Sequence, residues 1–577
     1  MTNAQIAEKF ELIADLLEIT GANFFRVRAY RNAARTIRDL DRSLATIAST
    51  SKDDLQKIDG IGKDLAEKIS TLLDTGEIPM LEELRQQVPE SVLALMRIPG
   101  LGPKKAAVLH KELGINTLEQ LRAACEAGTV KALKGFGAKT EQAILAGLAI
   151  AETAQQRMPW AKADEIAEAI RQHMQKLDEI EEMEFAGSYR RGKETVGDLD
   201  LLVVAGSSKK VMDHFGKLPF IGSVIVQGDT KMSIRTDTGM QVDLRVVDRP
   251  AFGAALQYFT GSKDHNVVLR GMAKDRGLKI NEYGVFKVTK EGEQYLCGAT
   301  EKEVYDAMDL PLFPPEIREA RQEFEAAKTG KLPKLIEQKD ICGDLHMHTT
   351  ATDGAASIVE MVEAAIAKGY SYIAITDHSQ RVTVARGLDP KRVLAQWKEI
   401  DELNKRYEGK FTILKGIECD ILEKAVMDLP DDVLAQADWV LASLHFGQRQ
   451  PREQIMERML MAARHPSVSA IAHPTGRLIG HRPPYDLDLE QLMDVIAEEG
   501  KMLELNASPE RLDLDDVQCA AAKRRGIPIV INTDAHSVAG LSAMRYGILQ
   551  ARRGALTAKD VANSRPWGQL KKMISKK

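Results

Sequence analysis

The period of hydrophobic and polar positions changes several times along the chain, and each change predicts a different kind of element. Residues 1–20, MTNAQIAEKFELIADLLEIT, place acids among apolar residues, which is typical of an amphipathic helix rather than a signal peptide. Residues 196–204, VGDLDLLVV, are mostly apolar and predict a strand. Beyond residue 340, apolar runs such as YSYIAIT, FTILKGI and IPIVINT alternate with helix-like stretches, which predicts repeated strand–helix units.

The composition narrows the class of protein. A chain of 577 residues suggests about four domains. It is 44% hydrophobic and 28% charged, as in soluble globular proteins, and no apolar run approaches the ~18 residues of a membrane span. Five scattered cysteines favour a reducing compartment. With a net charge of -5, nucleic acid could be bound only through local basic patches.

Two short segments in the first 150 residues share a pair of glycines around an apolar residue, followed by a helical pattern. They are IDGIGKDLAEKI at 58–69 and IPGLGPKKAAVL at 98–109, and LKGFGAKTEQAIL at 133–145 is a weaker third copy. Glycines allow close backbone approach and a helix N-terminus offers free N–H groups, which together suit a DNA phosphate. A tight helix–helix turn is the alternative. The pattern resembles helix-hairpin-helix motifs, which implies DNA contacts by Gly60, Gly62, Gly100, Gly102 and Lys104.

A basic stripe precedes the first glycine segment. Five arginines recur at steps of three and four and so share one helix face: Arg28, Arg31, Arg35, Arg38 and Arg42. A charged stripe usually faces solvent, but beside glycine hairpins a phosphate-facing role is at least as good an interpretation.

The predicted strand at 196–204 begins with two aspartates, Asp198 and Asp200. Side chains alternate along a strand, so both carboxylates point the same way. Two like charges beside a buried run need a cation or a proton between them. With Gly187-Ser188 upstream and Asp243 in the later run MQVDLRVV, the pattern resembles the nucleotidyltransferase superfamily. Three such acids suit two Mg²⁺ ions that promote in-line phosphoryl transfer.

The surrounding residues narrow this resemblance. GSYRRGKETVGDLDLLV at 187–203 and YFTGSKDHNVVLRGMAKDRGLKINEYGVF at 258–286 closely resemble family X DNA polymerases, of which DNA polymerase beta is the best-known member. The likeness extends from the glycine hairpins to LPLFPPEIRE at 310–319. It implies that Asp198 and Asp200 bind two Mg²⁺ or Mn²⁺ ions, and that Asp243 binds the catalytic one near the primer 3′-OH.

The same resemblance assigns the nucleotide pocket. Gly187, Ser188, Arg191 and Gly197 would hold the triphosphate, and Arg191 suits this through its planar fork of donors. Tyr258, Phe259 and Gly261 would line the sugar, Asn266 would touch the base edge, and Arg270 would contact the template. Lys263 departs from the family, because it replaces an acid that meets the nucleotide base.

The small N-terminal domain of the family can be a deoxyribose-phosphate lyase that uses a lysine Schiff base. Lys68 falls at that position, and Tyr30 matches a tyrosine of the same pocket. Asp64 replaces a companion lysine, which counts against lyase activity. The alternative is that Lys68 contacts a phosphate.

Residues of the types that bind metals recur at predicted strand ends after residue 340. They stand in GDLHMHT, TDH, GIECD, SLHF, IAHP and NTDAH, and they are His346, His348, His378, Glu418, His445, His473, Asp534 and His536. Polar residues at the carboxyl ends of successive strands are typical of a (β/α) barrel with its site on that face. Imidazoles mixed with carboxylates suit Zn²⁺, Mn²⁺ or Fe²⁺.

This set resembles the PHP (polymerase and histidinol phosphatase) domain, a distorted barrel of about seven strands with up to three metals. The resemblance groups the ligands as His346, His348, Glu418 and Asp534 for one metal; Glu418, His445 and His473 for a second; and Asp353, His378 and His536 for a third. Histidine is common in the family at the position of Asp353. The implied reaction is phosphoester hydrolysis with two or three Mn²⁺, Zn²⁺ or Fe²⁺ ions.

We therefore expect a multidomain α+β and α/β chain. The expected parts are an N-terminal helical, lyase-like DNA-binding domain at 1–88; a helix-hairpin-helix domain at 89–153; a nucleotidyltransferase palm with a mixed sheet at 154–255; a small α/β thumb that contacts nucleotide and template at 256–318; a linker at 319–340; and a distorted (β/α)7 PHP barrel at 341–577.

The leading functional hypothesis is a bacterial repair polymerase. It fills short gaps, as in base excision repair, and its PHP domain acts on DNA as a 3′–5′ exonuclease, abasic-site endonuclease or 3′-end processing enzyme. Its partners are gapped or primer–template DNA and deoxynucleoside triphosphates, with no membrane, as a monomer in the cytoplasm near the nucleoid. One alternative is a DNA-end-binding scaffold with weak catalysis, and another is a PHP domain that hydrolyses a small phosphate ester.

Overall fold

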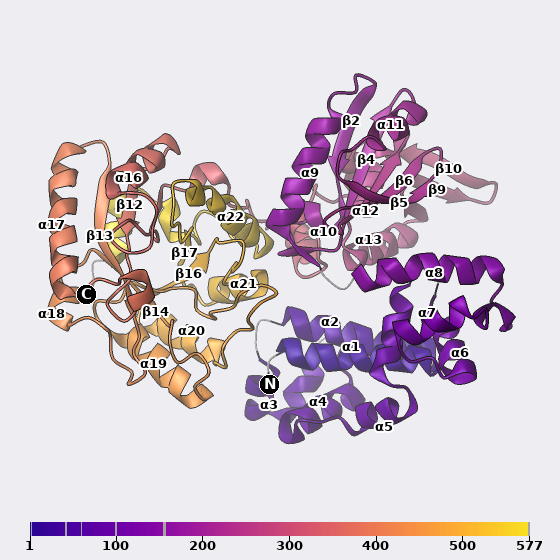
Figure 1. The fold of residues 1–577 in the computed structure, drawn as a ribbon, viewed down its shortest axis with the longest axis horizontal. Coiled ribbons are helices and arrows are strands. Elements are labelled where there is room, and N and C mark those ends of the chain that lie inside the picture. Colours follow the sequence, from indigo (N-terminus) through magenta and orange to yellow (C-terminus); the bar gives the residue numbers. More distant parts are fainter. Residues whose placement is uncertain (2, 41–42, 59, 99–100, 154–156, 575–577) are drawn as a thin grey trace. The chain divides into compact units, whose positions relative to one another are not determined.

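The computed structural model describes residues 1, 3–40, 43–58, 60–98, 101–153 and 157–574 (Figure 1). The chain divides into two compact units, Met1–Arg157 and Met158–Lys577, and each has hydrophobic cores of its own. Within the described residues, no helix combines the length and the apolar character that crossing a membrane requires.

The first unit is helical, as the sequence predicts. Its α-helices are α1 (Asn3–Ile19), α2 (Phe24–Asp39), α3 (Leu44–Thr50), α4 (Lys63–Thr75), α5 (Pro79–Gln87), α6 (Pro103–Leu113), α7 (Leu118–Glu126) and α8 (Ala138–Thr153). One buried cluster runs from Ile6 to Leu148, so the two expected helical domains share a core. Each glycine segment ends where a helix begins: Gly62 caps α4 and Gly102 caps α6.

The palm is a five-stranded mixed sheet. Its order is β2 (Ile180–Phe185), β4 (Asp198–Ala205), β7 (Gln241–Val246), β6 (Lys231–Thr236) and β5 (Ile221–Gln227), and only β4 and β7 run parallel. Leu199, Leu201 and Val203 of β4 pack with helices α9 (Trp160–Met174) and α11 (Ser208–Phe215). Leu202 and Val204 pack with α12 (Phe252–Thr260), so the alternation of β4 fills two cores. A short pair, β1 (Met158–Pro159) and β3 (Thr195–Val196), and helix α10 (Gly187–Arg190) flank the sheet.

The thumb follows the palm as a small α/β subdomain. Helix α13 (Lys263–Asp275) precedes the antiparallel strands β8 (Leu278–Asn281), β9 (Gly284–Thr289) and β10 (Gly292–Cys297), and α14 (Glu301–Asp306) comes after them. Gly253 of α12 lies against the backbone of Thr300, where a Cβ would meet main-chain atoms at 2.1 Å. This close approach joins α12 to the start of α14.

The C-terminal part is a parallel barrel whose strands follow one another in sequence order. They are β11 (Gly343–Asp344), β12 (Tyr372–Ile375), β13 (Thr412–Asp420), β14 (Trp439–Ser443), β15 (Ala470–Ile471), β16 (Met502–Asn506) and β17 (Ile529–Asn532). A bridge between Met347 and Ala535, just beyond β11 and β17, nearly closes the sheet. The predicted seven-stranded barrel is thus confirmed.

Two apolar layers hold the barrel. Tyr372, Leu414 and Trp439 belong to an inner cluster that Leu570 joins, whereas Ile373 and Ile413 face an outer cluster with the helices. The helices are α16 (Ile358–Ala367), α17 (Pro390–Arg406), α18 (Asp431–Leu434), α19 (Arg452–Arg464), α20 (Leu489–Glu498), α21 (Asp516–Arg524), α22 (Met544–Arg553) and α23 (Trp567–Ile574). Both faces of the strands are buried, which explains their continuous apolar runs.

Residues 319–340, expected as a linker, are ordered by contacts with their surroundings. They contain α15 (Glu323–Lys328), whose Glu323 is buried, and Ile336 joins the outer barrel cluster. Two charged residues of this segment pair with the barrel, Glu319 with Arg553 and Arg321 with Asp516.

Candidate functional site

Strands β4 and β7 bring the three predicted polymerase acids together. The strands are parallel neighbours, and Asp200 lies directly opposite Asp243. Asp198 stands two residues before Asp200 and so shares its face, while Leu199 points into the core. Three carboxylates therefore converge at one end of the palm sheet.

The electrostatics of this cluster favour a bound cation. Burial, followed by the charges of Asp198 and Asp243, raises the pKa of Asp200 to about 7. Lys231 Nζ lies 3.6 Å from Asp243 Oδ2, and Gln241 donates to Asp243 Oδ1 at 3.1 Å. The charges of Asp198 and Asp243 oppose ionisation of Asp200 unless a proton or a metal is present, and a set of carboxylate donors fits Mg²⁺ or Mn²⁺.

The residues expected to hold the triphosphate lie on helix α10 and in the segment that follows it. Gly187 has a φ of 65°, and a Cβ there would lie 2.8 Å from Asp200 Oδ2, so the approach to the acids requires glycine. Arg191 donates through Nε to Glu319 at 3.1 Å and through Nη1 to the carbonyl of Thr260. Ser188 is partly exposed on α10, and Gly197 is exposed just before β4.

The residues expected to contact sugar, base and template lie on α12 and α13. The Tyr258 and Phe259 rings meet edge-on at 5.1 Å, and the Arg270 guanidinium lies 5.9 Å from the Tyr258 ring centre. Asn266 is buried, and its amide donates to the Tyr258 carbonyl at 2.7 Å. Gly261 ends α12 with a φ of 66° and lies beside Arg191. In this arrangement the Asn266 amide is already hydrogen-bonded and must change partners to reach a base.

In the first unit, the expected DNA contacts are only partly described. Gly60 (φ of 78°) and Gly62 form the first hairpin, whereas Gly100 of the second lies outside the described residues. Gly102 and Lys104 are exposed at the start of α6. Free backbone N–H groups at these helix starts suit phosphate.

Two other predicted basic residues of this unit, Arg31 and Lys68, form ion pairs with acidic side chains. Arg31 is paired with Asp15 at 3.0 Å and with Glu18, so part of the basic stripe is neutralised within the fold. Arg42 lies outside the described residues. Lys68 forms an ion pair with Asp64, and both charges act on the hydroxyl of the buried Tyr30.

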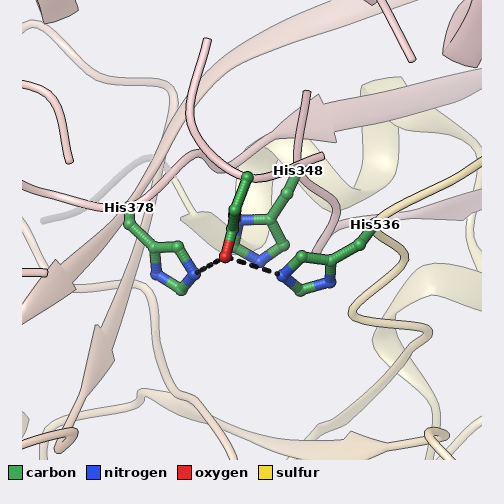
Figure 2. A group of neighbouring side chains, drawn as sticks. His348, His378 and His536 are labelled. Carbon is green, nitrogen blue, oxygen red and sulfur yellow. Dashed lines mark ion pairs between the residues drawn. The ribbon is translucent and has the colours of Figure 1, made fainter. Parts of the chain in front are cut away.

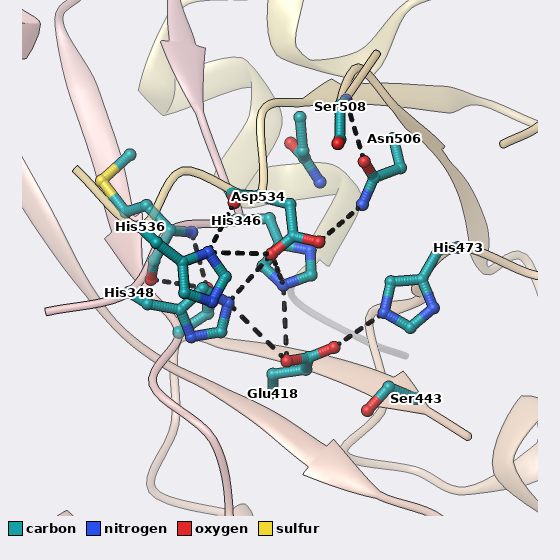
Figure 3. Close-up of polar contacts among 12 residues, drawn as sticks. His346, His348, Glu418, Ser443, His473, Asn506, Ser508, Asp534 and His536 are labelled. Carbon is teal, nitrogen blue, oxygen red and sulfur yellow. Dashed lines mark hydrogen bonds and ion pairs between the residues drawn. The ribbon is translucent and has the colours of Figure 1, made fainter. Parts of the chain in front are cut away.

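The side chains expected to bind metal in the PHP domain converge at the carboxyl ends of the barrel strands. Glu418 Oε2 lies 3.5 Å from His346 Nε2 and 3.7 Å from His348 Nε2. Asp534 Oδ1 lies 3.5 and 3.1 Å from the same two atoms (Figure 3). The four side chains expected for the first metal thus meet, although they come from residues nearly 190 positions apart.

The second and third expected groups adjoin the first. The other oxygen of Glu418, Oε1, lies 3.4 Å from His445 Nε2 and 2.9 Å from His473 Nε2, so Glu418 stands between two groups. Asp353 Oδ2 lies 3.5 Å from Nε2 of both His378 and His536 (Figure 2). Asp353 and His536 are 37% and 42% exposed, whereas His346 and Glu418 are at most 1% exposed. The cluster therefore opens to solvent on the side of the third group.

Protonated imidazoles balance the carboxylates of this cluster. Burial opposes a charge on His378, but the carboxylates of Glu418 and Asp353 raise its pKa to about 10. Burial also opposes ionisation of Glu418, yet the surrounding imidazoles hold its pKa well below the usual range. For His348, burial and the charge of His378 lower the pKa to about 4. The site thus places cationic imidazoles beside carboxylates, and bound metals can supply the positive charge in place of the imidazole protons.

The donor atoms fit divalent metals. Within the described residues, His346 Nε2, His348 Nδ1 and Glu418 Oε2 are buried and make no hydrogen bond. Such orphaned atoms are rare unless something else binds them. Mixed nitrogen and oxygen donors suit Mn²⁺, Zn²⁺ or Fe²⁺. His473 and Asp534 hold positive φ angles of 42° and 54°, which indicates that the fold maintains these ligands at some backbone cost.

Two residues of β16 support the ligands and were absent from the predicted set. Glu504 accepts a hydrogen bond from His346 Nδ1 at 2.7 Å, and the backbone N–H of His473 donates to its other oxygen at 2.7 Å. Asn506 donates to Asp534 Oδ2 at 3.1 Å. The sequence signal was MLELN, an apolar run with polar residues near its end at the point where a barrel strand was due.

The comparisons with known proteins agree with this architecture. Family models match a helix-hairpin-helix domain at 1–78, a SAM-like helix-hairpin-helix tandem at 92–149, the DNA polymerase beta palm at 157–239, the DNA polymerase beta thumb at 255–319 and a PHP domain at 344–508. Each match falls on the region where the structure places the corresponding elements.

Individual relatives cover either the whole chain or one part of it. The DNA polymerase/3′-5′ exonuclease PolX of Bacillus subtilis is 44% identical over 567 residues, which is 98% of both chains. DNA polymerase lambda of Rattus norvegicus is 27% identical over 55% of this chain and 56% of that protein. A probable phosphatase of Caldanaerobacter subterraneus is 33% identical over 33% of this chain and 75% of its own length. The chain therefore belongs to the family X DNA polymerases that carry a C-terminal PHP domain.

Proposed function

We propose that this protein is a DNA-directed DNA polymerase that fills short gaps during repair, and that its PHP domain removes nucleotides from DNA 3′ ends. One observation carries the proposal: two separate acid-rich sites, one on the β4–β7 pair and one on the barrel rim, occupy a single chain. The PolX relative, whose printed name combines polymerase and 3′–5′ exonuclease, supports it over nearly the whole chain.

At the polymerase site, we assign the chemistry to the palm and the start of the thumb. Asp198, Asp200 and Asp243 would hold two Mg²⁺ or Mn²⁺ ions, which supply charge neutralisation at the attacking and leaving oxygens. Ser188 and Arg191, beside Gly187 and Gly197, would hold the triphosphate in line with the primer end. Tyr258, Phe259 and Gly261 would line the sugar, with Asn266 at the base and Arg270 at the template.

At the PHP site, the three ligand groups would bind Mn²⁺, Zn²⁺ or Fe²⁺, which activate water and neutralise phosphate charge. The group of Asp353, His378 and His536 would face the incoming DNA end, because Asp353 and His536 are the most exposed of the expected ligands, at 37% and 42%. Glu504 and Asn506 would keep His346 and Asp534 oriented. Attack on the terminal phosphodiester releases one nucleotide and leaves a new 3′-OH.

The helix-hairpin-helix unit would bind the DNA on which both the polymerase site and the barrel site act. Phosphate contacts through Gly60, Gly62, Gly100, Gly102 and Lys104 do not read base sequence, which suits gaps at any position. Tethering raises the effective concentration of DNA ends at the barrel. We propose a monomer that works on chromosomal DNA in the bacterial cytoplasm.

Primer extension tests the polymerase assignment. We expect template-directed incorporation on a one-nucleotide gap with a 5′-phosphate, in Mg²⁺ or Mn²⁺, and less efficient incorporation on an open primer–template. No incorporation on either substrate, with DNA binding retained, would instead favour a DNA-end-binding scaffold.

A second function for the barrel is favoured by its likeness to a probable phosphatase. Turnover of 5′-labelled single-stranded DNA and of p-nitrophenyl phosphate, measured with Mn²⁺ on one preparation, separates the two. We expect stepwise shortening of the DNA at a higher kcat/KM. Faster turnover of the small ester, with the DNA intact, would assign a small-molecule phosphatase to the barrel.

A further inference from the structure

Helix α22 of the barrel packs directly against the palm segment that contains Arg191 and Gly192. Leu549 occupies the space beside Gly192, where a Cβ would lie 2.4 Å from Leu549 Cγ. Gly192 has a φ of 66° and immediately follows Arg191. On its other side α22 is fixed to the barrel, since a Cβ on Gly547 would lie 2.5 Å from Ile531 of β17. Side chains of α22 thus connect the barrel wall to the segment that carries Arg191.

Arg553, the last residue of α22, is the centre of a buried ionic network. Its side chain is 4% exposed. Nη1 donates to Glu319 Oε1 at 3.0 Å and to the backbone carbonyl of Arg191 at 2.9 Å, while Nη2 donates to Asp516 at 2.6 Å. One guanidinium therefore holds both the main chain of Arg191 and the carboxylate that pairs with its side chain.

Glu319 transmits this contact to the Arg191 side chain. Its Oε1 accepts from Arg191 Nε at 3.1 Å as well as from Arg553. Burial opposes ionisation of Glu319, but Arg553 and Arg191 lower its pKa to about 2, so it is an anion at neutral pH. The Thr260 carbonyl accepts from Arg191 Nη1. Within the described part of the chain, Nη2 of Arg191 has no hydrogen-bond partner, which leaves that end of the fork for a ligand.

We propose that Arg553 of the barrel is a positioning residue for nucleotide binding in the polymerase: through Glu319 and the Arg191 carbonyl, it orients the Arg191 guanidinium toward the triphosphate. The proposal rests on the assignment of Arg191 to the triphosphate in the proposed function. It makes the barrel a structural part of the polymerase site in addition to a nuclease. A guanidinium is needed because one ammonium cannot satisfy two carboxylates and a carbonyl in a fixed plane.

A second cross-domain ion pair provides the control. Arg545, also on α22, lies 2.8 Å from Asp164 of α9, and its side chain is 53% exposed. This pair joins the same two domains but does not involve Arg191. A defect caused by a loosened interface would follow from either arginine, whereas a defect in nucleotide orientation would follow from Arg553 alone.

The test compares R553K with R545K in the full chain. Lysine keeps the positive charge, so Glu319 and Asp516 are not left without a cation, and the fold is preserved. We expect R553K to raise the KM for the incoming nucleotide about tenfold with kcat within a factor of two, and R545K to leave both constants unchanged. Mn²⁺-dependent shortening of single-stranded DNA should be unchanged in both variants, because neither arginine contacts the barrel ligands.

A double-mutant cycle with R191A tests whether Arg553 acts through Arg191. If Arg553 acts through Arg191, the KM of R191A/R553K should equal that of R191A alone. The proposal would be overturned if the KM increases of R191A and R553K multiplied in the double variant. It would also be overturned if R545K and R553K raised the KM equally. An unchanged KM in R553K while the wild type polymerises would overturn it as well. Failure of the wild type to incorporate nucleotides would instead refute the proposed function itself.

Discussion

The two acid-rich sites of this chain differ in how completely the fold assembles them. At the barrel, His346, His348 and Glu418 are at most 1% exposed, and polar neighbours such as Glu504 fix their orientation. At the palm, Asp198 is exposed and the cluster consists of carboxylates with Lys231 close by. The barrel site is thus built in advance, whereas the palm site gains balancing charge only when metals and nucleotide arrive.

The charge pattern explains this difference. Imidazoles can carry protons in place of metals, and the raised pKa values of His346 and His378 offset part of the carboxylate charge of the barrel cluster. Carboxylates alone cannot balance one another, and the palm cluster instead keeps a proton near neutral pH. A polymerase takes up a triphosphate with its metal in every cycle, and a site completed by its substrate suits that task. A hydrolase that acts on DNA ends gains from ligands that stay in place.

Removal of a ligand from either site should have the largest effect and should separate the activities. We expect Asp200→Ala to lower incorporation by at least about 10²–10³-fold, as when one group that stabilises transition-state charge is lost. His346→Ala should lower nuclease activity to a similar degree and leave incorporation intact. Single-turnover incorporation and 3′-end shortening, measured on one preparation, check both variants. Loss of both activities in either variant would show that the sites are not independent.

The supporting hydrogen bonds should matter more at the preassembled site. Glu504→Gln removes the charge that faces His346 Nδ1, and we expect Mn²⁺ affinity at the barrel to fall about 10–100-fold. Gln241→Leu removes the hydrogen bond to Asp243 in the palm, and the Mg²⁺ requirement for incorporation should change only a few-fold. Metal titrations of each activity measure the two effects. Equal effects would contradict the contrast between the sites.

The sites should also respond differently to pH. Asp200, with a pKa of about 7, is protonated below that pH, so metal affinity at the palm should fall below pH 7 and level off above it. His378 must lose a proton to bind metal, and its pKa is about 10. Mn²⁺ affinity at the barrel should therefore still rise about tenfold per pH unit between pH 7.5 and 9 for each proton released. Calorimetry in buffers of different ionisation enthalpy counts those protons, and a flat barrel profile over this range would contradict the prediction.

Local pattern was sufficient to predict residues that the fold brings together at the two sites, but not the residues that support them. Asp198 and Asp200 stand out because charge interrupts an apolar strand, and the histidines stand out because each follows an apolar run. Glu504 also interrupts an apolar run, MLELN, but nothing in that run shows which residue it supports, and Arg553 at the end of a helix stands out in no local pattern. Their roles arise from tertiary contacts with His346 and Arg191, which are more than 150 residues away. Similarly, the polar pattern of residues 319–340 does not show that Glu319 pairs with both Arg191 of the palm and Arg553 of the barrel.

The smallest effect should come from Lys231, which tunes the palm without binding metal. Its charge lowers the pKa of Asp200, so Lys231→Met should move the pH midpoint of incorporation, at subsaturating Mg²⁺, upward by a fraction of a unit. Lys210→Met is the matched control, because Lys210 pairs with Glu179 on the surface. The shift should shrink as salt is added, since the Lys231 side chain is 36% exposed and ions screen it. A downward shift, or an equal shift in the control, would mean that Asp200 does not set the pH response. The proposed contrast, in which the palm cluster keeps a proton while the barrel cluster is assembled in advance, would then be wrong for the palm.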